Sequence, residues 1–252
     1  MENMETFQTS DNVRICYESV GSGIPIVLIH GWAATRNWWR RILPLDGYMA
    51  IIPDLRGHGN SSCGKNYHPI RMAEDILELL KHLGIENCIF VGHSLGGIVA
   101  TIAAKISGAD KLILVSPMIE STSTLRIVTT GLLIKRFNLL ARRMITPRTL
   151  YRPTRELLEF IWTESSKGSP DAYIDTLLSF RSINTIKVLR SYHGRKILII
   201  PEKDSLVPMA QQIIYLAEIV DRTMIIENVG HNCMLEAPEK FKKILLTALK
   251  NE

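Results

Sequence analysis

The chain of 252 residues contains few cysteines and no long hydrophobic run. Its four cysteines, Cys16, Cys63, Cys88 and Cys233, are widely spaced and include no C-x-x-C pair, which argues against a disulfide framework. No apolar run approaches the ~20 residues that span a bilayer, so we expect no integral membrane association. The beginning MENMETFQTSD lacks the basic end and apolar core of a signal peptide. We therefore expect a cytoplasmic protein with free thiols.

The common metal and cofactor motifs are also missing. The sequence has no H-E-x-x-H motif and no cluster of Cys and His residues, which argues against a metal site. It has no G-x-G-x-x-G motif, which argues against a dinucleotide. Residues 59–65 come close to a phosphate-binding P-loop, but Asn66 follows where that loop requires Ser or Thr. We therefore expect no cofactor.

Positive charge is concentrated in one part of the chain. The net charge is +5, and residues 118–195 hold 13 Lys and Arg against 6 Asp and Glu, whereas the rest holds 17 against 19. This segment contains no recognisable nucleic-acid-binding module, so we expect no nucleic acid partner. Two interpretations stay open: an ordinary solvated surface, or a surface for an acidic partner or an anionic membrane.

Short β-branched runs alternate with helical patterns along most of the chain. The runs are bounded by Gly, Pro and Asp and predict strands at 6–9, 13–20, 24–29, 49–53, 88–92, 112–115, 197–200 and 223–226. Helical periodicity is found at 70–83, 95–107, 208–220 and 238–250. The alternation predicts an α/β fold: a mostly parallel central sheet of about eight strands with helices on both faces.

The alternation stops after Pro117 and resumes at Arg195. The residues between them carry helical patterns and no clear strand. We therefore expect a core formed by residues 1–117 and 195–252, and a helical cap inserted at 118–194. Within this cap, four apolar side chains fall on one helical stripe, namely Leu133, Phe137, Leu140 and Met144.

Ser94 lies in a motif that suits a nucleophile. Gly92-His93-Ser94-Leu95-Gly96 matches the pattern G-x-S-x-G between an expected strand and an expected helix. A serine on so sharp a turn takes a strained conformation, and the residues two before and two after it must be small. The turn lifts the hydroxyl clear of the sheet and sets it at a helix N-terminus, which favours a developing anion.

At these residues the chain resembles the α/β-hydrolase superfamily. The resemblance covers nearly the whole chain, because other landmarks follow in the order of that family. His30-Gly31-Trp32 lies where the family places its oxyanion loop, and residues 54–61 are similar to its D-x-R-G-x-G-x-S turn. The resemblance implies the α/β-hydrolase fold with an inserted helical cap.

A serine hydroxyl needs a base to remove its proton, and the resemblance implies which residue supplies it. His231, in a Gly-His motif after the last expected strand, corresponds to the base. Asp204 corresponds to the acid that orients the imidazole, although Pro201 stands where the family usually has Gly. Glu120, after the preceding strand, is an alternative acid. The order Ser94, Asp204, His231 is the order found in these hydrolases.

The oxyanion hole would consist of two backbone N–H groups. One belongs to Leu95, which follows the nucleophile, and the resemblance assigns the other to Trp32. Each such donor typically contributes about 3–4 kcal/mol to transition-state stabilisation. We also expect the Trp32 ring to face the acyl pocket, with simple packing at a loop corner as the alternative.

These residues together predict a serine hydrolase that cleaves small-molecule carboxylic esters. Because the nucleophile position holds Ser94 rather than Asp, the sequence argues against the haloalkane dehalogenases and epoxide hydrolases of the superfamily. Lipase, thioesterase, lactonase, C–C hydrolase and cofactor-free perhydrolase activities share the same residues. An esterase that removes a methyl ester from a carrier-bound acyl chain is a more specific hypothesis, with an acidic carrier protein bound at the basic cap.

Two hypotheses from other classes remain. The chain could be a small-molecule receptor on a hydrolase scaffold, because an intact triad does not prove that turnover is the biological output. It could also bind a membrane surface peripherally through the basic, amphipathic cap.

Overall fold

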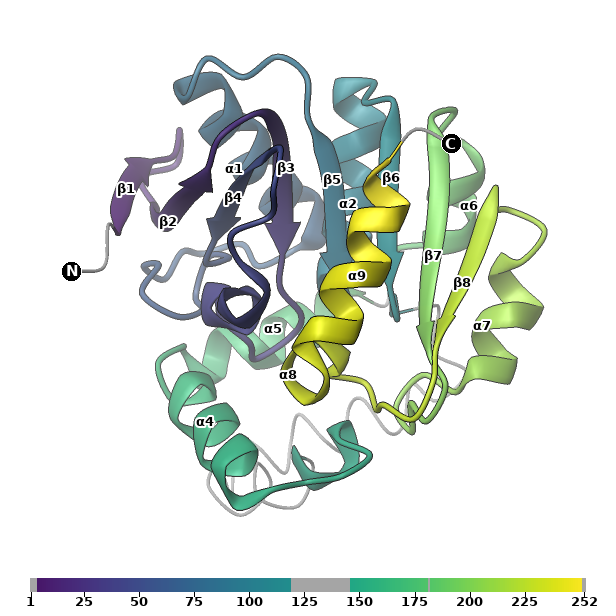
Figure 1. Cartoon of the computed structure of the whole chain (residues 1–252). Coiled ribbons are helices and arrows are strands. Elements are labelled where there is room, and N and C mark those ends of the chain that lie inside the picture. The colour runs from purple at the N-terminus through teal and green to yellow at the C-terminus, as the bar shows by residue number, and fades with distance from the viewer. Residues whose placement is uncertain (1–3, 119–145, 181, 251–252) are drawn as a thin grey trace.

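The computed structural model describes residues 4–118, 146–180 and 182–250 (Figure 1). Its centre is a sheet in the order β1-β2-β4-β3-β5-β6-β7-β8, in which β2 pairs antiparallel with β1 and β4 and all pairs from β4 to β8 are parallel. The strands are β1 (Glu5–Gln8), β2 (Arg14–Gly21), β3 (Ile24–Ile29), β4 (Tyr48–Pro53), β5 (Ile89–His93), β6 (Lys111–Val115), β7 (Arg195–Pro201) and β8 (Arg222–Ile226). The predicted mostly parallel sheet of eight strands is therefore confirmed.

Helices cover both faces of this sheet (Figure 1). One apolar layer includes α1 (Pro69–His82) and α2 (Leu95–Ser107), and the other includes η1 (Arg36–Ile42) and α9 (Pro238–Leu249). Neighbouring residues of one strand point into different layers: Val27 of β3 packs into the first and Leu28 into the second. Because both faces are buried, the central strands are continuous apolar runs, which is typical of parallel sheets.

Local sequence explains where the helices begin and end. His68 caps α1, its side chain accepting the N–H of Ile70, and Pro69 occupies the first turn, where its missing N–H costs nothing. Gly108, with a φ of 70°, ends α2. The helix expected at 208–220 is shorter than predicted: α7 covers Met209–Leu216.

The 3-10 helix η1 was not predicted. Thr35 caps it, with its hydroxyl accepting the N–H of Asn37. The helix buries two adjacent tryptophans, Trp38 and Trp39, and also Arg36. A buried arginine beside two tryptophans produces no apolar stripe of helical period, so the pattern contains no signal for this element.

Helices alone occur among the described residues between β6 and β7. They are η2 (Thr146–Thr149), α4 (Arg155–Ser165), α5 (Pro170–Phe180) and α6 (Thr185–Arg190). This agrees with the helical pattern expected there, and α4 and α5 lie together at one end of the sheet (Figure 1). The division into a core and a separate cap domain stays a prediction.

Two sequence predictions in this insertion concern residues outside the described ones. They are the apolar stripe and the alternative acid, formed by Leu133, Phe137, Leu140, Met144 and Glu120. In the part that is described, α4 contacts η1 through polar groups: Glu164 accepts from the Thr35 hydroxyl at 2.7 Å, and Arg41 pairs with Glu156 at 2.8 Å.

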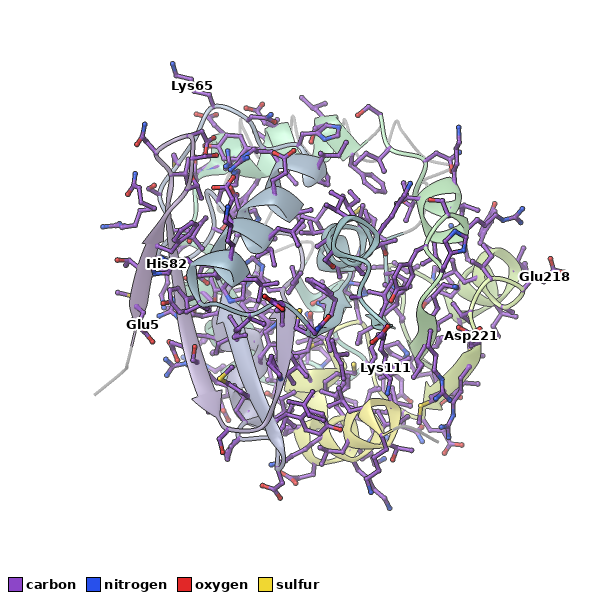
Figure 2. All side chains as sticks on the ribbon, turned by 90° about the horizontal axis from the view of Figure 1, so that it is seen from above. Glu5, Lys65, His82, Lys111, Glu218 and Asp221 are labelled. Atoms are coloured by element: carbon purple, nitrogen blue, oxygen red, sulfur yellow. The ribbon has the colours of Figure 1, made fainter. Side chains whose placement is uncertain are left out.

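Charged side chains lie mostly at the periphery, as the labelled Glu5, Lys65 and Glu218 do in Figure 2. Lys111 is an exception, because it is buried and its ammonium donates to the carbonyl oxygens of Leu249 and Lys250 at the end of α9. A cation at this position satisfies carbonyl groups that the helix leaves free. Of the helices within the described ranges, none is both long and apolar enough to cross a membrane.

Candidate active site

Four of the predicted site residues, together with Ser116, which was not predicted, follow five strands at the same end of the sheet. Loops after β3, β5, β6, β7 and β8 carry Trp32, Ser94, Ser116, Asp204 and His231, respectively. The carboxyl ends of parallel strands lie at one edge, and ligands of open α/β sheets bind outside that edge. The topology therefore gathers residues that are up to 199 positions apart in the sequence.

Ser94 occupies the strained turn that its motif predicts. Its backbone has φ 52° and ψ −118°, and its N–H donates to the carbonyl of Val115 on the next strand at 3.0 Å. A Cβ at Gly92 would lie 2.3 Å from the carbonyl oxygen of Gly96, and a Cβ at Gly96 would lie 2.3 Å from that of Ile29. The expected need for small residues on both sides of Ser94 is therefore confirmed.

Asp204 and His231 form a buried pair. His231 Nδ1 lies 2.8 Å from Asp204 Oδ2, while Asp204 Oδ1 accepts the backbone N–H groups of Leu206 at 2.8 Å and Val207 at 2.9 Å. Burial alone would raise the pKa of Asp204, but the His231 ring and the hydrogen bonds outweigh it and hold the pKa below its ordinary value. Asp204 is therefore ionised near neutral pH and able to orient the imidazole.

Sequence reasoning missed two polar side chains that support Asp204. The Ser116 hydroxyl donates to Asp204 Oδ2, and Gln212 Nε2 donates to Ser116 Oγ at 3.3 Å and to the carbonyl of Val207 at 2.7 Å. Ser116 directly follows β6, so its place at a strand end was the signal that could have found it. Gln212 lies inside α7, and nothing in the sequence distinguishes it from an ordinary helix residue.

His93 connects the Ser94 turn to the His231 loop. Its Nε2 lies 3.0 Å from the carbonyl oxygen of His231, and the centroids of the two rings are 4.7 Å apart. Burial, together with the neighbouring His231 ring, lowers the pKa of His93 to about 3. The ring is therefore neutral near pH 7, and because a carbonyl can only accept, its proton is on Nε2.

His231 and Ser94 lie in loops at the same end of the sheet. In the part of the chain that is described, no hydrogen bond links Ser94 Oγ to the His231 ring. In enzymes without bound substrate such contacts are often long and tighten only in the reacting complex. The described geometry thus contains the Asp204–His231 pair, and His93, the neighbour of Ser94 in the sequence, has its ring centroid 4.7 Å from that of His231.

The expected oxyanion loop lies against Ser94. A Cβ placed on Gly31 would be 3.1 Å from Ser94 Cβ, so the loop backbone passes close to Ser94. No described group accepts a hydrogen bond from the Trp32 backbone N–H. Leu95 is the first residue of α2, where helical N–H groups have no partner within the helix. Both N–H groups are thus available to an anion.

The Trp32 side chain contacts the insertion. Its indole Nε1 donates to the carbonyl of Tyr173 on α5 at 2.8 Å, and the two rings meet edge to face with centroids 5.8 Å apart. The ring is only partly buried. It therefore packs at the boundary between the sheet end and α5.

The D-x-R-G-x-G-x-S turn is held by a buried ion network. Asp54 Oδ2 pairs with Arg36 Nη1 at 2.5 Å and also accepts the N–H of Asn60. Arg56 is fully buried and pairs with Asp75 and Asp11. These contacts tie the turn to α1, to η1 and to the β1–β2 connection, which is a structural role.

A further histidine, His58, lies in this turn, and another, His30, lies beside it. His30 Nε2 accepts the N–H of Leu55 at 3.0 Å, so that ring is neutral. Burial lowers the pKa of His30 to about 4 and, together with the His30 ring, that of His58 to about 3. Neither ring is suited to carry charge in this environment. His231, by contrast, is paired with a carboxylate.

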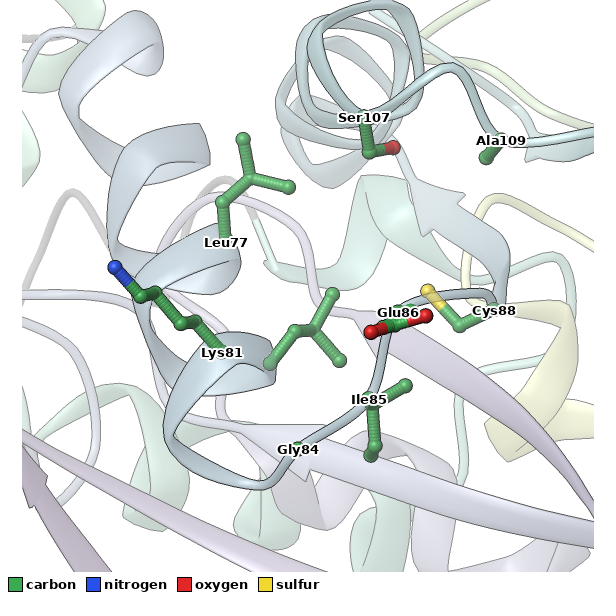
Figure 3. Close-up of a pocket in the computed structure, with 9 residues that line it drawn as sticks. Leu77, Lys81, Gly84, Ile85, Glu86, Cys88, Ser107 and Ala109 are labelled. Carbon is green, nitrogen blue, oxygen red and sulfur yellow. The ribbon is translucent and has the colours of Figure 1, made fainter.

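A cavity of about 270 Å³ lies at the other end of the sheet (Figure 3). It is lined by the ends of α1 and α2 and by residues 84–86, together with Cys88 and Ala109. Burial raises the pKa of the Cys88 thiol to about 12, so this thiol is a poor nucleophile. Among the described residues, no group of three or more His, Cys, Asp or Glu side chains could hold a metal ion.

Comparisons with known proteins agree with this architecture. A sequence profile described as the alpha/beta hydrolase family matches residues 26–244. A non-heme haloperoxidase from Rhodococcus erythropolis is 25% identical over 228 residues, which is 80% of this chain and 82% of the relative. A soluble epoxide hydrolase from Corynebacterium sp. is 41% identical over 90 residues, 34% of this chain and 32% of the relative. The solved structure of an esterase from Exiguobacterium antarcticum superimposes with a TM-score of 0.89 at 23% identity, covering both chains completely.

The fold and the strand-end loops define a hydrolase-type α/β enzyme. The profile match covers well over half of the sequence, and the chain belongs to the alpha/beta hydrolase family. Its relatives include haloperoxidases, epoxide hydrolases and esterases, so membership of the family does not by itself determine the reaction.

Proposed function

We propose that this protein is a serine hydrolase that cleaves carboxylic esters through an acyl-enzyme on Ser94. One observation carries the proposal: a serine on a strained strand-to-helix turn lies at the same sheet end as a buried His231–Asp204 pair 2.8 Å apart. The structural likeness to an esterase is consistent with it. Because the nucleophile is Ser94, the epoxide-hydrolase relative is a weaker guide to the chemistry.

The first half of the reaction forms the acyl-enzyme. His231 Nε2 takes the proton of Ser94 Oγ, and Oγ forms a bond to the acyl carbon, whose carbonyl oxygen becomes negative. The backbone N–H groups of Trp32 and Leu95 donate to this oxyanion. The tetrahedral intermediate then collapses, the bond to the leaving oxygen breaks, and His231 gives its proton to that oxygen, which departs as an alcohol.

The second half releases the acid. Water loses a proton to His231 Nε2 and attacks the acyl carbon, and collapse of the new intermediate breaks the bond to Ser94 Oγ. His231 returns the proton to Ser94. Throughout the cycle Asp204 holds Nδ1 and stabilises the imidazolium, because its carboxylate stays ionised in the folded protein.

Perhydrolysis is a second candidate, favoured by the haloperoxidase relative. In that reaction hydrogen peroxide replaces water in the second half and the acyl group leaves as a peracid. The same residues carry both reactions, so only the acceptor differs. Peracid formation from an ester and hydrogen peroxide, compared with carboxylic acid formation in water, would separate them.

The substrate class can be tested with a series of p-nitrophenyl esters from acetate to palmitate. Under the proposal, wild-type protein turns over at least one ester and reacts with a fluorophosphonate probe. Ser94→Ala loses the labelling and reduces kcat by a factor on the order of 10⁴ to 10⁶. Ser107→Ala, at the far end of α2, serves as a matched control and leaves both unchanged. Normal turnover by Ser94→Ala would contradict the proposal.

Other outcomes of these experiments would favour a different function for the protein. Labelling without turnover would favour a narrow substrate, such as an ester on an acidic carrier protein, or a receptor that retains its ligand. If salt did not change the turnover of carrier-bound esters, an electrostatic contact with the basic insertion would be contradicted. Flotation with anionic vesicles would identify a peripheral membrane protein.

A further inference from the structure

Within the insertion, residues 148–152 contact the end of the sheet that carries the candidate site, and we call them the return segment. This segment comprises the last two residues of η2 and the three that follow them, and it lies against the two loops that carry Asp204 and His231. The Ser205 hydroxyl, next to Asp204, donates to the carbonyl of Arg148. On the other side, Asn232, next to His231, donates its backbone N–H to the carbonyl of Thr149 at 3.1 Å.

Asn232 strengthens this contact with its side chain. Its Nδ2 donates to the hydroxyl of Thr149 at 2.8 Å, and its Oδ1 accepts from the indole of Trp38 at 3.1 Å. The buried amide thus joins the return segment to η1 as well as to the His231 loop.

The carboxylate of Glu236 accepts three backbone N–H groups in this region. Its Oε2 accepts the backbone N–H groups of Tyr151 at 2.8 Å and Arg152 at 3.2 Å, and its Oε1 accepts that of Gly230 at 2.9 Å. Gly230 immediately precedes His231. One carboxylate therefore links the backbone on which His231 stands to the return segment.

Gly230 packs too closely against the return segment and Glu236 to carry a side chain. A Cβ on Gly230 would lie 2.5 Å from the backbone nitrogen of Tyr151 and 2.7 Å from Glu236 Oε1. An ionised carboxylate accepts hydrogen bonds at both oxygens and donates none, so it suits three converging N–H groups. An amide of the same shape accepts at only one atom and presents two hydrogens where acceptors are needed.

We infer that Glu236 is a positioning residue for His231, acting through the backbone of Gly230 and the return segment. It would set the orientation of the imidazole by holding the peptide before it, without contact with substrate. The inference rests on the proposed function, because it assigns His231 as the base. It extends that function by connecting the inserted helices to the base through a single carboxylate.

The test compares Glu236→Gln with Glu239→Gln, a control on the exposed first turn of α9. Kinetics on the best p-nitrophenyl ester, the rate of fluorophosphonate labelling and the thermal midpoint are measured for both variants. For Glu236→Gln we expect kcat to fall about ten- to hundredfold with KM changed less than about threefold, because a displaced base slows chemistry more than binding. Glu239→Gln should match wild type.

A second readout does not depend on activity. The downfield proton resonance of His231 Nδ1, assigned by its loss in His231→Gln, reports the Asp204–His231 hydrogen bond directly. We expect this resonance in wild type and in Glu239→Gln, and its broadening or loss through faster exchange in Glu236→Gln.

The outcomes separate the two claims. If wild type shows neither turnover nor labelling, the proposed function fails, and the resonance still decides whether Glu236 positions His231. An unchanged resonance in Glu236→Gln overturns the inference whatever the activity. A kcat restored by cooling below the unfolding range would show that Glu236 contributes only to stability, which also overturns it.

Discussion

Asp54 and Asp204 each follow the carboxyl end of a strand, and both carboxylates are buried. Both accept backbone N–H groups at one or both oxygens: Asp54 accepts those of Arg36 and Asn60, and Asp204 accepts those of Leu206 and Val207. By composition and position, the two sites are close equivalents.

The charged partner makes the difference. Asp54 pairs with the guanidinium of Arg36, which stays protonated at all accessible pH values. Asp204 pairs with the imidazole of His231, the side chain whose proton is exchanged most readily near neutral pH. The first pair can only hold a loop in place, whereas the second can hold a ring while that ring gains and loses a proton. Burial of a carboxylate is thus not a functional signal until its partner is known.

The same substitution at both positions would separate these roles, and the largest expected effect is on activity at Asp204. Asp204→Asn should lower kcat for an ester about 10⁴-fold, because the amide no longer fixes the tautomer of His231. The measurement is steady-state kinetics on the ester that wild type prefers. Retention of more than a tenth of the activity would remove Asp204 as the orienting acid and favour Glu120.

Asp54→Asn is the matched change and should act on stability. It leaves the Arg36 guanidinium buried with less compensation, although Glu18 still contacts Arg36 Nε at 2.6 Å. We expect a loss of about 3 kcal/mol in the free energy of unfolding, the lower end for a broken buried ion pair. The thermal midpoint should fall by roughly 6–12 °C, while kcat of the folded protein stays near wild type. A normal midpoint with a large loss of kcat would reverse the comparison.

A smaller effect is expected when the pH is lowered. It arises from buried histidine rings that are neutral, in contrast to the buried ion pairs of Asp54 and Asp204. The pKa values of His30, His58 and His93 are lowered to about 4, 3 and 3, all chiefly by burial, whereas unfolded histidine titrates near 6.5. Between pH 6.5 and 4 these histidines bind protons in the unfolded chain but stay neutral in the folded protein. Stability is therefore complete above pH 6.5 and decreases as the pH falls.

Each of these rings contributes a slope of up to about 1.4 kcal/mol per pH unit. Denaturant unfolding at half-unit steps from pH 7 to 4.5 would measure the total slope. His58→Gln should reduce it by one ring's share, whereas His193→Gln, at an exposed position, should leave it unchanged. Equal slopes in wild type and His58→Gln would contradict the buried neutral state of His58.

The sequence predicted the sheet well because every strand has a local signature. Buried strands such as β3 and β7 are short β-branched runs. The Ser94 turn is marked by Gly92 and Gly96, at which the crowded backbone leaves no space for a side chain. Both signals are contained within a few neighbouring residues.

Features that depend on distant partners were not predictable in this way. Ser116 matters because Asp204, 88 residues away in sequence, lies against it. Glu236 matters because it contacts backbone N–H groups 84 and 85 residues earlier, and backbone groups are the same at every position. Its carboxylate also accepts the N–H of Gly230, six residues earlier. Such pairings become visible only when the topology has brought the loops together.

A protein tolerates insertions and deletions in a surface segment when the residues at the two ends of that segment keep their positions. The hydrogen bonds on residues 148–152 fix one such end beside the loops of Asp204 and His231. Insertions, deletions or exchanges between Met118 and Arg148 can therefore accumulate over generations without displacing either loop. Selection could in this way reshape what the inserted helices recognise while the proposed bond-breaking residues are inherited unchanged.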